Sequence, residues 1–296
     1  MKKIHLLSLG CLLALFMMPL SAAADDYVRG DADLDGQITP ADISALINYL
    51  LNGEWPQPAT PDMVYTVNGV TFKMIPVEGG TFMMGGTEEQ GTDAGSSEKP
   101  VHQVTLSSYA IGETEVTQEL WEAVMGSNPS QYQQGPTYPA DAITWAAAKE
   151  FAAALSTLTG QTFRLPTEAE WEFAARGGNL SQGYKYPGSN NIDDVAWYGD
   201  SHGDLGRSHP VAQKQPNELG LYDMAGNVKE WTNDYYARYT ADAVTNPTGP
   251  ATGAVVVNRG GEWPSLATQC RVSTRNAEFP DANSYNGLRL VMEMPQ

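Results

Sequence analysis

The residues whose spacing points most directly to chemistry are the acidic side chains of residues 31–42. Aspartates alternate along DADLDG, and Gly36 stands where a tight turn is needed. Alternating carboxylates on a tight loop converge on one point, which suits a hard cation that takes about six to eight oxygen ligands. Asp42 alone has the alternative of completing a cap with Thr39 in a solvated loop. We expect a calcium loop, and its ligands are Asp31, Asp33, Asp35, the backbone carbonyl of Gln37, and Asp42.

A second candidate lies in residues 259–275, RGGEWPSLATQCRVSTR, where Ser265 and Cys270 are five positions apart. Two cysteines at these positions would suit the soft ion Cu(I), which prefers thiolates. A serine hydroxyl is a hard donor and stays protonated at neutral pH, so one thiol with one alcohol makes a weak Cu(I) site. Glu262 adds a negative charge, and a carboxylate raises the pKa of a neighbouring thiol. We expect no copper site here, and Cys270 as a small buried apolar residue.

The other groups of polar residues give weaker evidence for a chemical site. His202, Asp204 and His209 are close in sequence, but they lie in a glycine-rich loop without helical register, so loop polarity explains them better than a transition-metal site. We find no nucleophile–base set and no glycine loop for phosphate. The remaining notable residues are expected to be structural, and they are the core tryptophans Trp121, Trp145 and Trp171 and the paired arginines Arg164 and Arg289.

The bulk composition narrows the class of protein. The formal net charge is -18, so no basic surface offers itself to nucleic acid or to an anionic membrane. Hydrophobic residues make up 42% of the sequence, which allows a packed core. The 29 glycines and 19 prolines predict a fold rich in loops rather than in long helices.

The N-terminal segment has the pattern of a secretory signal peptide, residues 1–24. Two lysines precede a largely apolar run, and SAAADD then places small residues near Ala24, where we expect cleavage. A lipoprotein signal around Cys11 is the weaker alternative, because little apolar sequence precedes this cysteine and the run continues past it. No other apolar run is long enough to span a membrane. We expect a secreted, periplasmic or cell-surface protein whose remaining cysteine, Cys270, forms no internal disulfide.

The elements that must position these residues can be read locally. Strand-like runs cover residues 64–77, 79–86 and 102–113. Three helices have a threonine at the start and a glycine at the end, and the third also has a capping box between Thr167 and Glu170. The expected helices are residues 118–125 after Thr117, 145–159 after Thr144, and 168–176 after Thr167. The fold class is α+β with a low content of regular structure.

The acidic segment and its surroundings form a separate module. Residues 25–53 hold the calcium loop and a helix with Ile43, Leu46 and Leu50 on one face, and residues 54–63 read as a proline-rich linker. The calcium loop followed by NYLLNG resembles a type I dockerin repeat. That resemblance implies a cohesin-like partner and attachment of a secreted enzyme to a scaffold or surface. Dockerins usually carry two such repeats, and this chain carries one.

The large domain, residues 64–296, carries five ordered blocks: MIPVEGGTFMMGG, EKPVHQVTLSSYAIGETEVTQELW, FRLPTEAEWEFAARGG, NELGLYDMAGNVKEWTNDYY, and RGGEW followed by CRVSTR and NGLRLV. Together they resemble the formylglycine-generating enzyme family, also called sulfatase-modifying factor. The resemblance implies an α+β fold related to C-type lectin domains. It also implies oxidation of a cysteine in a Cys-x-Pro-x-Arg motif of a sulfatase, with O2 and a Cu(I) ion held by two thiolates. The two copper cysteines of the family fall on Ser265 and Cys270.

The same resemblance implies a second calcium site at DMAGNVKEW. Its side-chain ligands would be Asp223 and Glu230, and its backbone ligands would be the carbonyls of Gly226 and Val228. The alternative is a surface turn in which Gly226 and Asn227 are present because they tolerate positive φ.

Two functions follow as expectations. The first is an exported, calcium-stabilised binding or assembly module in the extracytoplasmic handling of polysaccharides or sulfated glycans. Its glycan or protein ligand would meet a loop surface built from residues 262–274 and 276–286. The alternative is an active formylglycine-generating oxidoreductase, or a different oxidation supported by the same pocket, and Ser265 with Cys270 discriminates between the two.

Overall fold

The computed structural model describes residues 63–199 and 207–294. The chain divides into two units, residues 1–61 and 62–296, and the described residues belong to the second. The expected signal peptide, the calcium loop and the linker up to residue 62 lie outside the described residues, as do His202 and Asp204, whereas Met63, predicted as the last linker residue, begins β1. None of the described helices is both long and apolar enough to cross a membrane.

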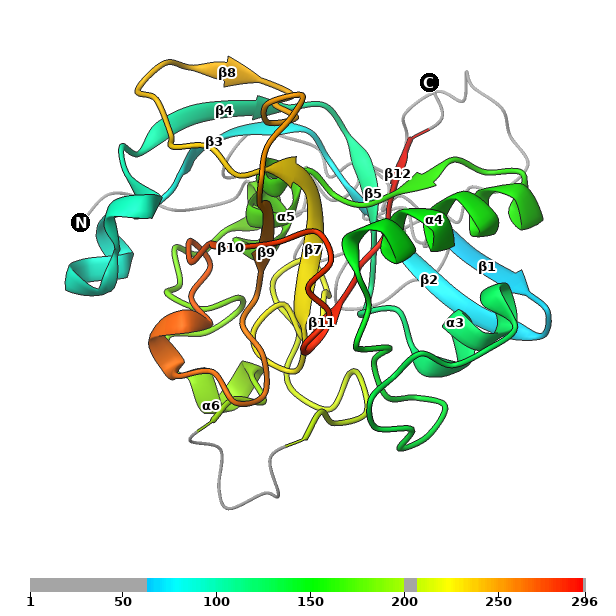
Figure 1. Ribbon diagram of the computed structural model, residues 1–296. Helices are drawn as coiled ribbons and strands as arrows, with labels where there is room; N and C mark the ends of the chain where they lie inside the picture. The colour runs from blue at the N-terminus through cyan, green and yellow to red at the C-terminus, as the bar shows by residue number, and fades with distance from the viewer. Residues whose placement is uncertain (1–62, 200–206, 295–296) are drawn as a thin grey trace, which may run out of the picture. The chain divides into compact units, whose positions relative to one another are not determined.

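A five-stranded antiparallel sheet forms one side of the domain. Its order is β1-β2-β5-β12-β6, so the last strand of the described residues lies between two strands from much earlier in the sequence (Figure 1). Asn68 and Gly69, both with positive φ, close the hairpin between the first two strands, as an Asn-Gly turn does. The strands are β1 (Met63–Val67), β2 (Val70–Val77), β5 (Tyr109–Gly112), β6 (Phe163–Arg164) and β12 (Val291–Glu293).

Two smaller sheets complete the strand structure. The four-stranded sheet has the order β10-β9-β7-β11, and its last pair is parallel. The three-stranded sheet has the order β3-β4-β8. Their strands are β7 (Lys229–Tyr235), β9 (Val256–Arg259), β10 (Asn276–Glu278) and β11 (Asn286–Gly287) in the first, and β3 (Gly80–Met84), β4 (His102–Leu106) and β8 (Val244–Thr245) in the second.

The three predicted helices are confirmed. The threonine before each helix accepts a backbone N–H from its first turn, and Thr167 and Glu170 form the predicted capping box. The third helix ends one residue earlier than predicted, with Arg176 as its C-cap before Gly177 at φ +89°. The helices are α3 (Gln118–Met125), α4 (Trp145–Thr159), α5 (Glu168–Ala175) and the short α6 (Ile192–Val195), and the 3-10 turns are η1 (Glu88–Asp93), η2 (Ser96–Glu98), η3 (Gly178–Leu180) and η4 (Ala267–Gln269).

One predicted run is divided differently. Residues 102–113 form two strands in two different sheets, β4 and β5. Between them, the Ser107 N–H donates to Asn246 Oδ1 at 2.8 Å, and Ser108 Oγ accepts the Gly79 N–H at 3.0 Å. These side-chain contacts take the place of ladder bonds, so the chain can pass from one sheet to the next.

The predicted core tryptophans are placed as expected, with one difference. Trp121 stacks on Phe151 at 4.8 Å between ring centroids, and Trp171 is fully buried. Trp145 is half-buried and donates its indole N–H to Thr232 O at 2.8 Å.

The two arginines expected to be paired are paired with carboxylates, Arg164 with Glu170 and Arg289 with Glu230.

Candidate functional site

The segment that holds Ser265 and Cys270 begins where β9 ends. Gly260 and Gly261 follow that strand with φ of +91° and +78°, a conformation that favours glycine. A Cβ on Gly261 would lie 2.7 Å from Cys270 Sγ, so a side chain at this position would collide with the sulfur. The two glycines therefore fold the segment back so that Cys270 packs beneath the turn.

Ser265 closes a turn with its own hydroxyl. Its Oγ accepts the backbone N–H of Glu262 at 3.0 Å, and its backbone N–H donates to the Glu262 carbonyl at 2.8 Å. The residue is buried. This is the local hydrogen bonding that serine provides in turns, and it fixes the hydroxyl in the loop.

Cys270 is a fully buried thiol, as its sequence context predicts. It packs in a small cluster with Tyr186, Ile192 and Tyr198, and its Sγ lies 3.8 Å from the Leu266 carbonyl oxygen. Burial raises the pKa of this thiol to about 12, and the Glu262 carboxylate adds a smaller increase. The expected effect of Glu262 is present, but burial dominates it, and the thiol is protonated at neutral pH.

The loop with the second predicted calcium set precedes β7. Gly226 and Asn227 have positive φ, so the turn of the alternative interpretation is present, but residues 223–228 are buried and it is not a surface turn. Asp223 is buried, its Oδ2 accepts the Ala212 N–H at 2.7 Å, and its Oδ1 has no hydrogen-bond partner among the described residues. Burial raises the pKa of Asp223 to about 6. A buried carboxylate oxygen without a partner suits a cation ligand.

Glu230 is placed differently from Asp223. Both of its oxygens are engaged, by Arg289 and by the indole N–H of Trp171 at 2.6 Å. Binding of calcium by this carboxylate would compete with the arginine. Within residues 63–199 and 207–294, no group of three or more His, Cys, Asp and Glu side chains could hold a metal ion. A site here would therefore depend on Asp223 and on the backbone carbonyls of Gly226 and Val228, and it stays a prediction.

Glu115 joins this loop, and sequence reasoning missed it. Its carboxylate accepts the Asn227 side-chain N–H at 2.7 Å and the Val228 backbone N–H at 3.0 Å. Burial raises the pKa of Glu115 well above its ordinary value, and the carboxylates of Asp223 and Glu230 raise it further. No local signal could have found this contact, because the partners are more than 110 positions apart in sequence.

The loop surface expected from residues 262–274 and 276–286 is only partly a surface. Residues 270–274 are buried, because Arg271 pairs with Glu98 at 2.8 Å and Ser273 also hydrogen-bonds that carboxylate. The parts that reach solvent are residues 262–264, residues 266–269 and most of 276–285, which carry the solvent-facing side chains of Leu266 and Phe279.

A charged and aromatic cluster lies between these two exposed parts. Lys229 Nζ is 2.9 Å from Glu262 Oε2 and also pairs with Glu278. Glu278 accepts the side-chain N–H of Asn286 at 2.8 Å. The Trp263 ring meets Tyr285 edge-on, with centroids 5.2 Å apart. The first and second exposed segments are thus tied together by ion pairs and ring packing.

The sequence of this chain is similar to those of several known proteins. The chain is 33% identical over 267 residues to chaperone protein LppX of Paenibacillus barcinonensis, covering 74% of this chain and 86% of that protein. It is 30% identical over 279 residues to the formylglycine-generating enzyme of Streptomyces coelicolor, covering 72% of this chain and 86% of the enzyme. Serine/threonine-protein kinase Pkn1 of Chlamydia trachomatis is 33% identical over 253 residues, but the match spans 38% of that kinase.

The fold has solved relatives as well. The structure of Treponema denticola variable protein 1 superposes with a TM-score of 0.72 at 34% identity, covering 79% of this chain and all of that one. This likeness confirms the mixed helix-and-sheet fold expected from the sequence. Residues 64–294 match the model of the sulfatase-modifying factor enzyme 1-like domain. The chain therefore belongs to the sulfatase-modifying factor family, which includes the formylglycine-generating enzymes.

Proposed function

We propose that this protein is a family member without copper-dependent cysteine oxidase chemistry, and that it works as an exported binding or assembly module in extracytoplasmic glycan handling. The observation that carries the proposal is the state of Ser265 and Cys270. These two residues stand where the family resemblance puts the copper thiolates. One is a hydroxyl used to close a turn, and the other is a buried, protonated thiol.

The chemistry of this pair is unfavourable for Cu(I). With a thiol pKa of about 12, Cys270 stays protonated at pH 7. The sequence has two cysteines, and the other is Cys11, which we expect to be removed with the signal peptide. A second thiolate is therefore lacking where a soft metal ion would need it.

The exposed loops offer a surface for a glycan or protein ligand. Residues 262–269 and 276–285 present Leu266 and Phe279 beside the Lys229, Glu262 and Glu278 ion pairs. Mixed aromatic, amide and charged side chains on loops are typical of recognition surfaces. The similarity to a protein named as a chaperone supports a binding or assembly role over catalysis.

Calcium and a cohesin-like partner belong to the same proposal. We infer one calcium ion at the Asp31–Asp42 loop and a second at Asp223, with the carbonyls of Gly226 and Val228. The loop and its helix would attach the protein to a scaffold or surface. The support for the second ion is the partnerless Oδ1 of Asp223.

The alternative is an active formylglycine-generating oxidoreductase, and the 30% identity to the Streptomyces coelicolor enzyme favours it. The experiment that separates the two incubates purified protein with Cu(I), O2 and a Cys-x-Pro-x-Arg peptide. Mass spectrometry then measures the aldehyde product. The wild type and a Ser265→Cys variant are compared, with a known formylglycine-generating enzyme as the positive control and circular dichroism as the check on folding.

The outcomes are distinct. We expect no aldehyde from the wild type; aldehyde at a rate comparable to the control enzyme would overturn the proposal. Product from Ser265→Cys alone would locate the loss of copper chemistry in one side chain. The binding role is tested on immobilised polysaccharides and sulfated glycans with Phe279→Ala, which should weaken binding. Leu158→Ala, at a comparably exposed position on α4, serves as the matched control.

A further inference from the structure

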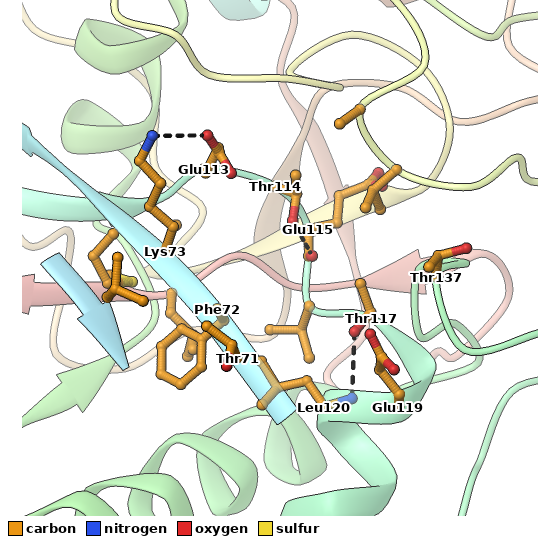
Figure 2. A pocket seen from close by; sticks show the side chains of 17 residues that line it. Thr71, Phe72, Lys73, Glu113, Thr114, Glu115, Thr117, Glu119, Leu120 and Thr137 are labelled. Atoms are coloured by element: carbon orange, nitrogen blue, oxygen red, sulfur yellow. Dashed lines mark hydrogen bonds and ion pairs between the residues drawn. The ribbon is translucent and has the colours of Figure 1, made fainter. Parts of the chain in front are cut away.

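A pocket of about 440 Å³ opens beside the start of α3 (Figure 2). It is lined by β2, by residues 112–117, by the first turn of α3 and by the loop around Val211. None of its lining residues belongs to the loop surface of residues 262–286, so it is a separate place on the domain. Its volume lies within the range of roughly 300–1,000 Å³ that is usual for ligand pockets.

The lining includes three glutamates, Glu113, Glu115 and Glu119, and one lysine, Lys73. Glu113 pairs with Lys73 at 3.2 Å. Glu115 is held by amide N–H groups of Asn227 and Val228, and no described cation lies within ion-pair distance of it. Glu119 is half-buried, and its carboxylate has no hydrogen bond or ion pair with any residue the structure describes. Glu119 is thus the carboxylate on this wall that has no cation among the described residues, whereas burial raises the pKa of Glu115 and the charge of Arg289 acts on it.

The rest of the pocket lining is apolar, and this also limits which ligand fits. Met74, Val116, Leu120 and Leu290 line the pocket and are buried, so they present apolar surface beside the carboxylates. A ligand with an alkyl stem and a positive head satisfies both parts, because the stem covers apolar surface while the head meets the charge.

The acceptors in the pocket are separate groups. Figure 2 shows Glu115, Thr117 and Glu119 along the same wall, with Thr137 nearby. A guanidinium presents a rigid planar fork that matches one carboxylate, whereas an ammonium presents three donors around a compact charge. Separate acceptors on neighbouring residues favour the ammonium. A metal ion is disfavoured because no set of three ligating side chains is found among the described residues.

We propose that this pocket binds a primary alkylammonium group, carried by a lysine side chain of a partner protein. The formal net charge of -18 favours encounter with a basic partner and gives the interaction a dependence on salt. Glu119 should make the strongest interaction with the ammonium group, because its carboxylate has no hydrogen bond or ion pair with a described residue that would have to be broken. The site is independent of the glycan-binding proposal, but it adjoins the proposed calcium loop, because Ala212 of its lining donates to Asp223 and Glu115 accepts the Val228 N–H.

The test uses the full-length purified protein and the tripeptide acetyl-Gly-Lys-Gly-amide, with binding measured by isothermal titration calorimetry at low salt. Acetyl-Gly-norleucine-Gly-amide keeps the alkyl stem and lacks the charge, and the matching arginine peptide distinguishes the two cations. Glu119→Gln removes the free carboxylate. Glu122→Gln, at an exposed position of the same helix that does not line the pocket, is the matched control.

We expect the lysine peptide to bind about tenfold more tightly than the norleucine peptide and more tightly than the arginine peptide. Glu119→Gln should weaken its binding by about fivefold, since hydrogen bonds to charged groups contribute roughly 1.5–3 kcal/mol and part of this is screened. Glu122→Gln should leave binding unchanged. No binding of the lysine peptide, equal binding of the norleucine or arginine peptide, or no effect of Glu119→Gln would each overturn the proposal.

Discussion

Arg289 and Glu230 form a buried ion pair with several hydrogen bonds at the centre of the domain. Arg289 Nη2 lies 2.8 Å from Glu230 Oε1, and Arg289 Nε lies 3.0 Å from Glu230 Oε2. The arginine also donates to the carbonyls of Gly112 and Tyr222, and the glutamate accepts from Trp171. One pair thus joins the end of β5, the start of β7, helix α5 and the segment before β12.

Replacing Arg289 by methionine should therefore be severely destabilising. It would leave a fully buried Glu230 carboxylate without its cation, and breaking a buried pair costs roughly 3–5 kcal/mol. Urea unfolding should show a loss of this size in the free energy of unfolding. Lys73→Met breaks the half-exposed pair with Glu113 and should cost less than about 1 kcal/mol. Similar losses for both variants would contradict the central role of Arg289.

Cys270 should be inert in the folded protein. It is fully buried, and burial raises the pKa of its thiol to about 12, so neither access nor ionisation favours attack. A thiol-specific chromogenic reagent at pH 8 should label it only on unfolding, at a rate that follows urea concentration. Because an unfolded thiol ionises near pH 8.5 and the folded one does not, its contribution to stability declines as the pH rises from about 9 towards 12. Rapid labelling of the native protein would contradict this placement.

Asp234 should make stability depend on pH in the acidic to neutral range. Burial raises the pKa of Asp234 to about 7, and the carboxylates of Glu168 and Glu170 add to the shift while Arg275 opposes it. The folded protein therefore keeps a proton that the unfolded chain loses near pH 4. The stability this proton contributes is complete below about pH 4 and declines as the pH rises to about 7.

The variant Asp234→Asn isolates this effect. An asparagine oxygen can still accept the Glu168 N–H that Asp234 Oδ2 accepts at 3.0 Å. The free energy of unfolding of the variant, relative to the wild type, should increase between pH 4 and 7 and then level off. Asp242→Asn makes the same change of charge at an exposed position and controls for net charge. A constant difference across this range would refute the assignment.

The helices could be predicted because their signals are local. Thr117, Thr144 and Thr167 precede them, and a glycine follows each or stands one residue beyond. The division of residues 102–113 between two sheets could not be predicted, because it depends on contacts of Ser107 and Ser108 with distant residues.

The buried charges were the main feature that local patterns could not supply. Glu168 and Glu172 occupy one face of α5 and are buried, although acids on a helix usually face water. Their partners Arg259 and Arg275 come from a segment about 90 to 110 positions away, with Arg259 Nη2 at 2.5 Å from Glu172. Similar ion pairs explain why residues 270–274 are not part of the loop surface, because Arg271 within the segment pairs with buried Glu98 and Arg275 after it pairs with buried Glu168.

The effect of the substitution Asp223→Asn on stability should differ between EDTA and calcium. Without a cation, the buried Oδ1 of Asp223 has no described partner, and this costs free energy. Asp223→Asn should therefore be as stable as the wild type, or more stable, in EDTA. With calcium at about 100 times the dissociation constant, a bound ion would stabilise the wild type by about 2.7 kcal/mol, and the variant should lack this gain. Thermal unfolding in EDTA and in calcium measures both effects, and Asp33→Asn separates the contribution of the N-terminal loop. The comparison is between the Asp33→Asn variant and the double variant that carries both Asp33→Asn and Asp223→Asn. If calcium raises the Tm of both by the same amount, no ion binds at Asp223.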